Sequence, residues 1–277
     1  MPWGNMAGKP AKVFTIMEKS EMNFNMLNVT HADGITIIGL NRTNVMNALN
    51  LELIRELDRA VSASAENREV RALVIHGEGD HFAAGADISE MADIGPEQAA
   101  RFSFSPVFNS LAALPMPVIA AIDGYALGGG LELTLACDIR ICSPTAKFGL
   151  PEANVGIFPG AGGTQRLPQL IGPGRAADLI FTGRIITAET AVSWGLCSRM
   201  FDKDVRQAGI DLAGNIAAGP PLALAGAKSA MQTGISQGFN TGISRESELW
   251  AGLFSSRDQK EGMTAFLEKR KPQFKGC

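Results

Sequence analysis

Glu132 follows a glycine-rich segment that could stabilise negative charge. Residues 123–136 read DGYALGGGLELTLA, come directly after an apolar run at 118–122, and place Gly129 three residues before Glu132. The first N–H groups of a helix lack partners within the helix and lie at the positive end of its dipole, so they can stabilise an oxyanion. Glu132 falls in the first turn, where its carboxylate can face the same space. Taken alone, it would more often be an ordinary N-terminal helix charge.

A second glutamate, Glu152, ends the segment FGLPE and precedes a glycine-rich bend at 156–163. A further loop of small residues, HFAAGADISEM at 81–91, follows the apolar run that ends at His76. Small side chains let a ligand approach the backbone, whose N–H groups can then donate to an anion or a polarised carbonyl. The plainer interpretations are a solvated surface carboxylate for Glu152 and a tight strand-to-helix connection for the loop.

Three other patterns do not support a site. Residues 234–238 match the G-x-S-x-G nucleophile elbow, but a helical pattern precedes Ser236 and all three histidines lie before it. Residues 172–177 imitate a dinucleotide fingerprint without a preceding strand pattern, and Pro173 removes a backbone donor. The four cysteines form no CxxC pair and lie far from the histidines, so no zinc site is expected.

The elements that must position these residues follow an α/β rhythm. Apolar runs rich in Val and Ile predict strands at 35–40, 72–76, 118–122 and 139–142, and helical spacing predicts helices at 51–65, from Pro96 onward, and through 131–136. Residues 1–25 are interpreted as a loose extension, residues 26–204 as the α/β core, and residues 205–277 as a C-terminal helical region.

That helical region is predicted from apolar spacing at 205–218, 222–232, 244–254 and 259–269. Its aromatic residues, such as Trp250, Phe254 and Phe266, are interpreted as packing residues rather than as a ligand site. An apolar face on a helical appendage also suits a subunit interface, so oligomerisation is expected.

The composition excludes several partners. A net charge of −3 with both signs interspersed gives no field to attract nucleic acid or an anionic membrane surface. No apolar run reaches the roughly 18 residues that span a bilayer. The sparse cysteines and the lack of a signal-like start favour a reducing, cytoplasmic location.

Taken together, the motifs resemble those of the crotonase (enoyl-CoA hydratase/isomerase) superfamily, and the enoyl-CoA hydratases most of all. The similarity runs from about residue 28 to residue 271 and rests on AAGAD at 83–87, GYALGGGLE at 124–132, FGLPE at 148–152 and PGAGGTQR at 159–166. The resemblance implies a spiral of ββα units followed by a helical region that forms trimers, often paired into hexamers.

The resemblance also implies roles for individual residues. The N–H groups of Ala86 and Gly129 would form an oxyanion hole for the thioester oxygen. The loop with Ala84, Ala86, Asp87, Ile88 and Ser89 would line the path of coenzyme A, and Gly160 would lie beside the attacking water.

Glutamate at both 132 and 152 resembles the pattern of hydratases. Glu132 is expected to activate water as a carboxylate, and Glu152 to deliver a proton to C2, with no metal or redox cofactor because coenzyme A belongs to the substrate. A delta isomerase, another acyl-CoA enzyme of the same fold, and a CoA-binding or RNA-binding relative without activity remain as alternatives. The length and polarity of the acyl group stay open.

Overall fold

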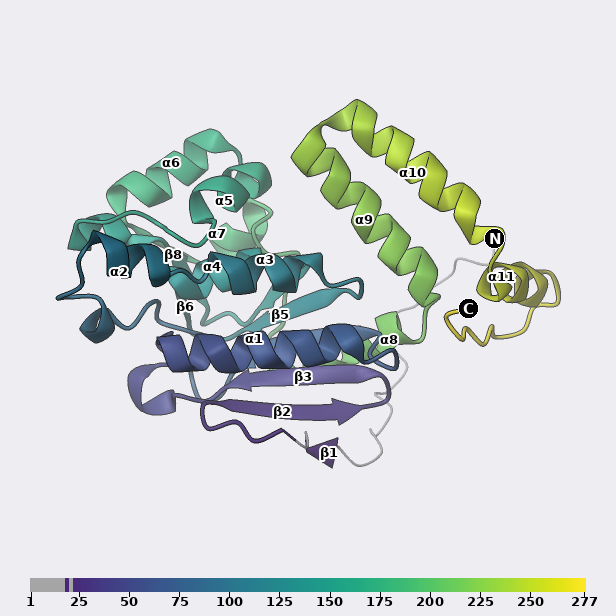
Figure 1. Cartoon of the computed structure of the whole chain (residues 1–277), viewed down its shortest axis with the longest axis horizontal. Helices are drawn as coiled ribbons and strands as arrows, with labels where there is room; N and C mark the ends of the chain where they lie inside the picture. Colours follow the sequence, from purple (N-terminus) through teal and green to yellow (C-terminus); the bar gives the residue numbers. More distant parts are fainter. Residues whose placement is uncertain (1–17, 20–21) are drawn as a thin grey trace.

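A mostly parallel sheet forms the centre of the protein. Figure 1 shows the computed structural model of the chain, which describes residues 18–19 and 22–277. Within these residues, seven strands hydrogen-bond in the order β1-β2-β3-β4-β5-β7-β10. Their bounds are β1 Glu18–Lys19, β2 Leu27–Ala32, β3 Ile35–Leu40, β4 Ala72–Gly77, β5 Val118–Ile122, β7 Ile139–Cys142 and β10 Arg199–Met200. From β3 to β10 neighbouring strands are parallel, whereas β1, β2 and β3 pair antiparallel.

The strands predicted at 35–40, 118–122 and 139–142 are confirmed with the same bounds, and the strand at 72–76 is one residue longer. Every residue of β3 and β5 is buried. Parallel strands that are covered on both faces read as near-continuous apolar runs, which is why this sheet was visible in the sequence. Strand β2 was not predicted.

A second, smaller sheet carries the glycine-rich segments. In the described part of the chain it contains three strands in the order β6-β8-β9, with bounds β6 Tyr125–Leu127, β8 Lys147–Gly149 and β9 Ile185–Thr187. The sequence predicted that a loop leads from β5 directly into the next helix, and β6 lies between them instead. A strand of three residues is too short to show a period of its own, and β6 exists because it pairs with β8.

Helices cover both faces of the main sheet. Their bounds are α1 Leu51–Glu66, α2 Pro96–Arg101, α3 Ser105–Ala113, α4 Gly129–Leu135, α5 Gly163–Ile171, α6 Pro173–Thr182, α7 Ala188–Ser193, α8 Val205–Ala217, α9 Pro221–Gln237, α10 Phe239–Leu253 and α11 Arg257–Leu267, with 3-10 turns η1 Thr43–Val45, η2 Ile88–Glu90 and η3 Pro151–Val155. The helices predicted at 51–65, from Pro96 onward, and through 131–136 are therefore confirmed, the last with an earlier start.

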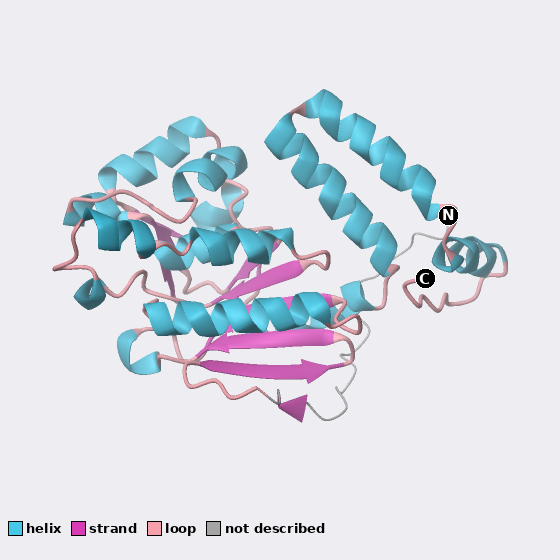
Figure 2. Cartoon of the chain, viewed as in Figure 1, coloured by secondary structure: helices cyan, strands magenta, loops and turns pink. Residues whose placement is uncertain are grey.

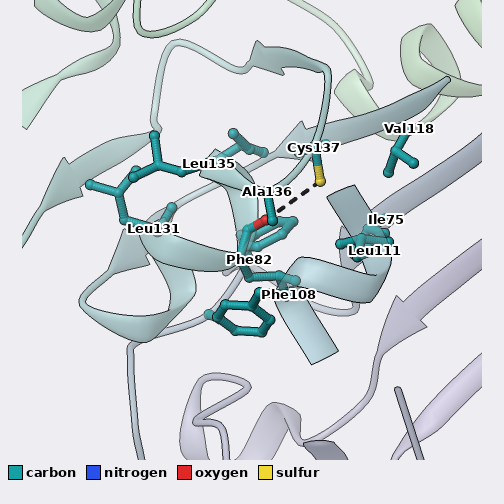
Figure 3. Packing of buried hydrophobic residues seen from close by; sticks show 14 of the residues in the cluster. Ile75, Phe82, Phe108, Leu111, Val118, Leu131, Leu135, Ala136 and Cys137 are labelled. Carbon is teal, nitrogen blue, oxygen red and sulfur yellow. Dashed lines mark hydrogen bonds between the residues drawn. The ribbon is translucent and has the colours of Figure 1, made fainter. Parts of the chain in front are cut away.

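Alternate residues of β4 face two different cores, as the period of a strand requires. Leu73 and Ile75 belong to a large core with residues of α1, α3 and α4. Ala72 and Val74 belong to a smaller core with residues of α8. Figure 3 shows Phe82 and Phe108 near each other in the large core, with Ile75 to one side and Leu131 of α4 to the other. The first turn of α4 is thus held by the main core.

The C-terminal region is helical, as predicted. Figures 1 and 2 show α9 and α10 as a hairpin that stands away from the sheets, with α11 beyond it. The hairpin turns at Gly238, whose φ of 92° favours glycine, and Gly234 meets Gly242 so closely that a Cβ on Gly242 would lie 2.6 Å from the Gly234 Cα.

The interpretation of Trp250, Phe254 and Phe266 as packing residues stays a prediction. These side chains are 62%, 39% and 58% exposed in the single chain. Helical spacing shows which face is apolar and cannot show what covers it.

The division of the chain at 25/26 and 204/205 stays a prediction. Residues 1–17 and 20–21 lie outside the described residues, while Glu18 and Lys19 pair with β2, and the N–H groups of Asn25 and Met26 donate to the Glu56 carboxylate at 2.8 Å each. Although α8 follows residue 204, it packs on strands β3, β4 and β5.

Candidate active site

Four loop segments surround a cavity of about 330 Å³ at one end of α4. The residues predicted from the sequence that line it are Ala84, Ala86, Ile88, Gly129, Glu132, Glu152 and Gly160. Large apolar side chains, namely Met91, Phe102, Phe104, Ile157 and Phe158, form much of the remaining wall. The structure therefore brings both glutamates and both proposed oxyanion donors to one cavity, although they come from segments far apart in the sequence.

The Ala86 N–H is left free by the pairing of its own loop. Leu49 and Ala86 form a parallel bridge in which the Leu49 N–H donates to the Gly85 carbonyl at 2.7 Å and the Asp87 N–H donates to the Leu49 carbonyl at 2.8 Å. This pattern uses the groups on either side of Ala86, so its own N–H points away from Leu49. Among the described residues that N–H has no hydrogen-bond partner, which suits an oxyanion donor.

Glycine suits each of the three positions 128–130 before Glu132 for a different physical reason. Gly128 has φ 51° and ψ −127°, a conformation that is accessible mainly to glycine. Gly129 is the first residue of α4, and its N–H is also without a partner in the described part of the chain. Gly130 packs against the Ala83 carbonyl, where an added Cβ would lie at 2.3 Å. The tight approach sets the mouth of α4 beside the loop that carries Ala86.

Glu132 is only 3% exposed, and its carboxylate is held by backbone donors. The N–H groups of Ala161 and Gly163 each donate to its Oε1 at 2.7 Å. Burial raises the pKa of Glu132, while these two hydrogen bonds and the charge of Arg166 oppose that rise. Gly163 is needed because a Cβ there would lie 2.9 Å from Glu132 Oε1. The sequence showed the glycine bend but not that its N–H groups bind Glu132.

Glu152 lies in η3 with a different environment. Its Oε2 is buried and has no hydrogen-bond partner among the described residues. The pKa of Glu152 is raised to about 7, chiefly by burial and also by the nearby charge of Glu132, against the opposing effect of its own backbone N–H. The Glu132 carboxylate accepts from two backbone donors, whereas Glu152 has only its own backbone N–H to stabilise its anion, so a proton is better placed on Glu152.

Asp87 and Ser89 do not line this cavity. Asp87 accepts two hydrogen bonds from the Arg42 guanidinium at 3.1 Å and one from the Ser89 hydroxyl at 2.6 Å. Chiefly through the Ser89 hydroxyl, with help from Arg42, the pKa of Asp87 is lowered. Arg42, which the sequence did not single out, also donates to the Ala48 carbonyl at 2.5 Å, so it ties the loop of Ala86 to the neighbouring turn. The contact of Asp87 and Ser89 with coenzyme A stays a prediction.

The patterns that were set aside have structural roles. Ser236 lies within α9 and donates to the Gln232 carbonyl, far from any strand-to-helix elbow. Residues 172–177 are the turn at Gly172 and the first part of α6, and they follow helix α5 rather than a strand. No cluster of three or more metal-binding side chains occurs among the residues described. No helix within those same residues is both long and apolar enough to cross a membrane.

The sequence and the fold match known proteins closely. The model of the enoyl-CoA hydratase/isomerase family matches residues 30–277. The chain is 40% identical to a short-chain-enoyl-CoA hydratase of Clostridium acetobutylicum over 86% of this chain and 92% of that protein. It is 41% identical to a mitochondrial methylglutaconyl-CoA hydratase of Mus musculus over 88% of this chain and 80% of that protein.

A crystal structure of an enoyl-CoA hydratase from Bacillus anthracis superposes on this chain with a TM-score of 0.86 at 40% sequence identity. The match covers 91% of this chain and 100% of that one. The expected crotonase-type spiral with its C-terminal helical region is confirmed by this likeness. The chain belongs to the enoyl-CoA hydratase/isomerase family.

Proposed function

We propose that this enzyme adds water reversibly across the 2,3 double bond of a 2-enoyl-CoA thioester to give a 3-hydroxyacyl-CoA. One observation supports this most: Glu132 and Glu152 face one cavity in unequal environments, and that cavity also contains the unpaired N–H groups of Ala86 and Gly129. Hydratases among the relatives agree with this activity.

The proposed reaction begins at the thioester carbonyl, which accepts hydrogen bonds from Ala86 and Gly129. Glu132 takes a proton from water as the oxygen attacks C3, and the electron pair of the double bond moves to the carbonyl oxygen as an enolate. A donor aimed at such an oxyanion contributes about 2.7–4 kcal/mol in mutational studies. The enolate then takes the Glu152 proton at C2, and proton exchange returns Glu132 and Glu152 to their starting states.

Proton transfer also changes the balance between the two glutamates. When Glu132 becomes neutral, its charge no longer raises the pKa of Glu152, so Glu152 releases its proton more readily. The pair therefore favours donation at the stage when the enolate needs it. No metal or redox group has a step in this proposal, because coenzyme A enters as part of the substrate.

A delta isomerase is the runner-up activity. There one glutamate would move a proton between C2 and C4 without net addition of water. The two-carboxylate arrangement favours hydration because it supplies a separate base and acid.

The activities are separated by incubating the purified enzyme with crotonyl-CoA and with a 3-enoyl-CoA. Hydration consumes the absorbance of the conjugated enoyl thioester and gives a product that contains oxygen from ¹⁸O-labelled water. Conversion of the 3-enoyl-CoA to the conjugated isomer, without incorporation of ¹⁸O from the labelled water when crotonyl-CoA is the substrate, would instead support the isomerase.

The proposal includes a homotrimer, alone or paired into a hexamer. Support comes from the apolar groove along α9 and α10, which is lined by Met231, Ile235, Phe239, Ile243 and Trp250 among others. Several of these side chains are more than half exposed in the single chain, which is unfavourable for a patch that stays in water.

A cytoplasmic location completes the proposal. Cys137, Cys142 and Cys197 are buried free thiols, and the fourth cysteine, Cys277, is exposed and also free. Unpaired thiols of this kind fit a reducing compartment.

A further inference from the structure

We propose that Arg166 is a positioning residue that fixes the loop at 160–163 and thereby holds Glu132 in place to activate water. This inference rests on the proposed hydration reaction. Arg166 does not line the cavity, and it has no direct hydrogen bond to Glu132. Its influence passes through the backbone that separates the two side chains.

The loop presents its peptide groups to opposite sides. The N–H groups of Ala161 and Gly163 donate to Glu132 Oε1 at 2.7 Å each. Between them, the Ala161 carbonyl accepts a hydrogen bond from Arg166 Nη1 at 3.1 Å. N–H groups that converge on one oxygen make an anion-binding concavity, and Arg166 holds this loop through the carbonyl of Ala161.

Gly162 makes the hydrogen bond between Arg166 and the Ala161 carbonyl possible. Its φ of 106° lies in the left-handed region that favours glycine, and an added Cβ would lie only 2.1 Å from Arg166 Nη1. The glycine therefore allows the loop to turn and allows the guanidinium to approach the turned backbone. Any side chain at 162 would displace Arg166 from the Ala161 carbonyl.

Helix α3 holds both Arg166 and the loop at 160–163 through hydrogen bonds. Arg166 Nη2 donates to Asn109 Oδ1 at 2.6 Å, and the Ser105 hydroxyl donates to the Gly160 carbonyl at 3.1 Å. Both partners come from α3, whose Phe108 is buried in the large core. Because the planar guanidinium fork holds two acceptors in fixed directions, it joins the loop to a rigid helix in a way that an ammonium group does not reproduce.

The positive charge of Arg166, like its hydrogen bonds, favours a Glu132 that can activate water. The charged side chains that interact electrostatically with Glu132 are Arg166 on α5 and Glu152 on η3. Arg166 lowers the pKa of Glu132, so it favours the carboxylate form that activates water. Its removal is expected to leave Glu132 both less well oriented and more easily protonated.

The test compares Arg166→Met, Arg166→Lys and Asn109→Ala with the wild-type enzyme, using crotonyl-CoA across a range of pH. For Arg166→Met we expect kcat to fall about tenfold or more, as small misplacements of catalytic groups do. We also expect the acidic limb of kcat/KM to move to higher pH. The KM for crotonyl-CoA should change little, because Arg166 does not touch the cavity.

The other two variants separate charge from geometry. Arg166→Lys keeps the positive charge and should return the acidic limb toward its wild-type position while kcat stays low. Asn109→Ala keeps the whole guanidinium and removes one anchor, so it should lower kcat without moving the limb. These two variants also provide the test if Arg166→Met does not fold.

An acidic limb that stays at the wild-type pH in folded Arg166→Met, or a kcat for Arg166→Lys and Asn109→Ala equal to that of the wild type, would overturn the inference. A merely structural role would lower the melting temperature or the yield and leave the limb unmoved. Failure of the wild-type enzyme to hydrate crotonyl-CoA would instead contradict the proposed function.

Discussion

The two cavity glutamates differ in what surrounds their oxygens, although both have raised pKa values. Glu132 is buried with two N–H donors on Oε1, whereas Glu152 leaves Oε2 buried and unpaired within the described residues. A buried oxygen without a partner is costly unless it carries a proton or meets a ligand. Glu152 is therefore suited to give a proton away, and Glu132 is suited to remove one from water.

This assignment predicts a bell-shaped dependence of kcat/KM on pH. Activity requires the Glu152 proton, so it should be present below about pH 7 and lost as the pH rises through the Glu152 pKa of about 7. Activity also requires the Glu132 carboxylate, so it should be lost as the pH falls through the Glu132 pKa, which burial holds above its usual value.

The pH profile of Glu152→Gln provides the control. The amide cannot titrate, so the residual activity of this variant should lack the basic limb near pH 7. A basic limb that persists unchanged in Glu152→Gln would show that another group supplies the proton.

At the scale of elements, the smaller sheet and the mouth of α4 determine the geometry of the site. Strand β6 pairs with β8 and, through Ala126, with Ala83 of the loop that carries Ala86. Gly128 then turns the chain into α4. A displacement at this point would move an oxyanion donor and a glutamate together.

Gly128→Ala is expected to damage both stability and activity. Its φ of 51° with ψ −127° is a sparsely populated conformation that costs alanine about 1–3 kcal/mol. An added Cβ would also lie 3.1 Å from Glu152 Oε1. Chemical denaturation and the crotonyl-CoA assay measure the two effects.

Gly174→Ala is a matched control for this change. Gly174 lies in α6 with open space around its Cα and with no positive φ, so alanine there should be neutral or stabilising by about 0.5–1 kcal/mol. Equal losses of stability in the two variants would contradict the account of Gly128.

The sequence predicted the elements whose signals are local. Strands β3, β5 and β7 were found with their bounds because each is a short run in which Ile and other apolar residues predominate, flanked by polar or turn residues. Strands β6, β8 and β9 were missed because three residues show no period, and their existence depends on partners far along the chain. The glycine-rich mouth of α4 was visible because its residues are adjacent in the sequence.

The contacts that hold the cavity residues in place could not be predicted, because they too depend on partners far along the chain. Glu132 meets Ala161 across 29 residues, and Arg42 meets Asp87 across 45. Such contacts depend on the folded structure, and no local sequence pattern predicts them. The glycines at 160, 162 and 163 were the only sequence signal for the loop that holds Glu132.

At the scale of the whole molecule, the α9–α10 hairpin presents an apolar face that the single chain leaves uncovered. Trp250 is 62% exposed and packs edge-on against Phe254, with ring centroids 4.7 Å apart. We therefore expect light scattering of the wild-type protein to give a mass of three chains or of six. Trp250→Glu should shift the mass toward smaller species, because an unpaired charge in an apolar interface is unfavourable.

Arg68→Glu is the control for this variant, because Arg68 is exposed after α1 and does not line the groove along α9 and α10. It should leave the mass unchanged. A monomeric wild-type protein, or a Trp250→Glu variant with the wild-type mass, would contradict the proposed interface.

The central claim is that Glu132 and Glu152 act as one acid–base unit in hydration. The most direct measurement is the kcat for crotonyl-CoA hydration by the wild type, Glu132→Gln, Glu152→Gln and the double variant. Each single change should lower kcat by about 10²–10⁴-fold. The double variant should lose little more, because residues that act as a unit are strongly non-additive. A single variant with near-wild-type turnover, or a double variant whose loss is the product of two independent losses, would contradict the account.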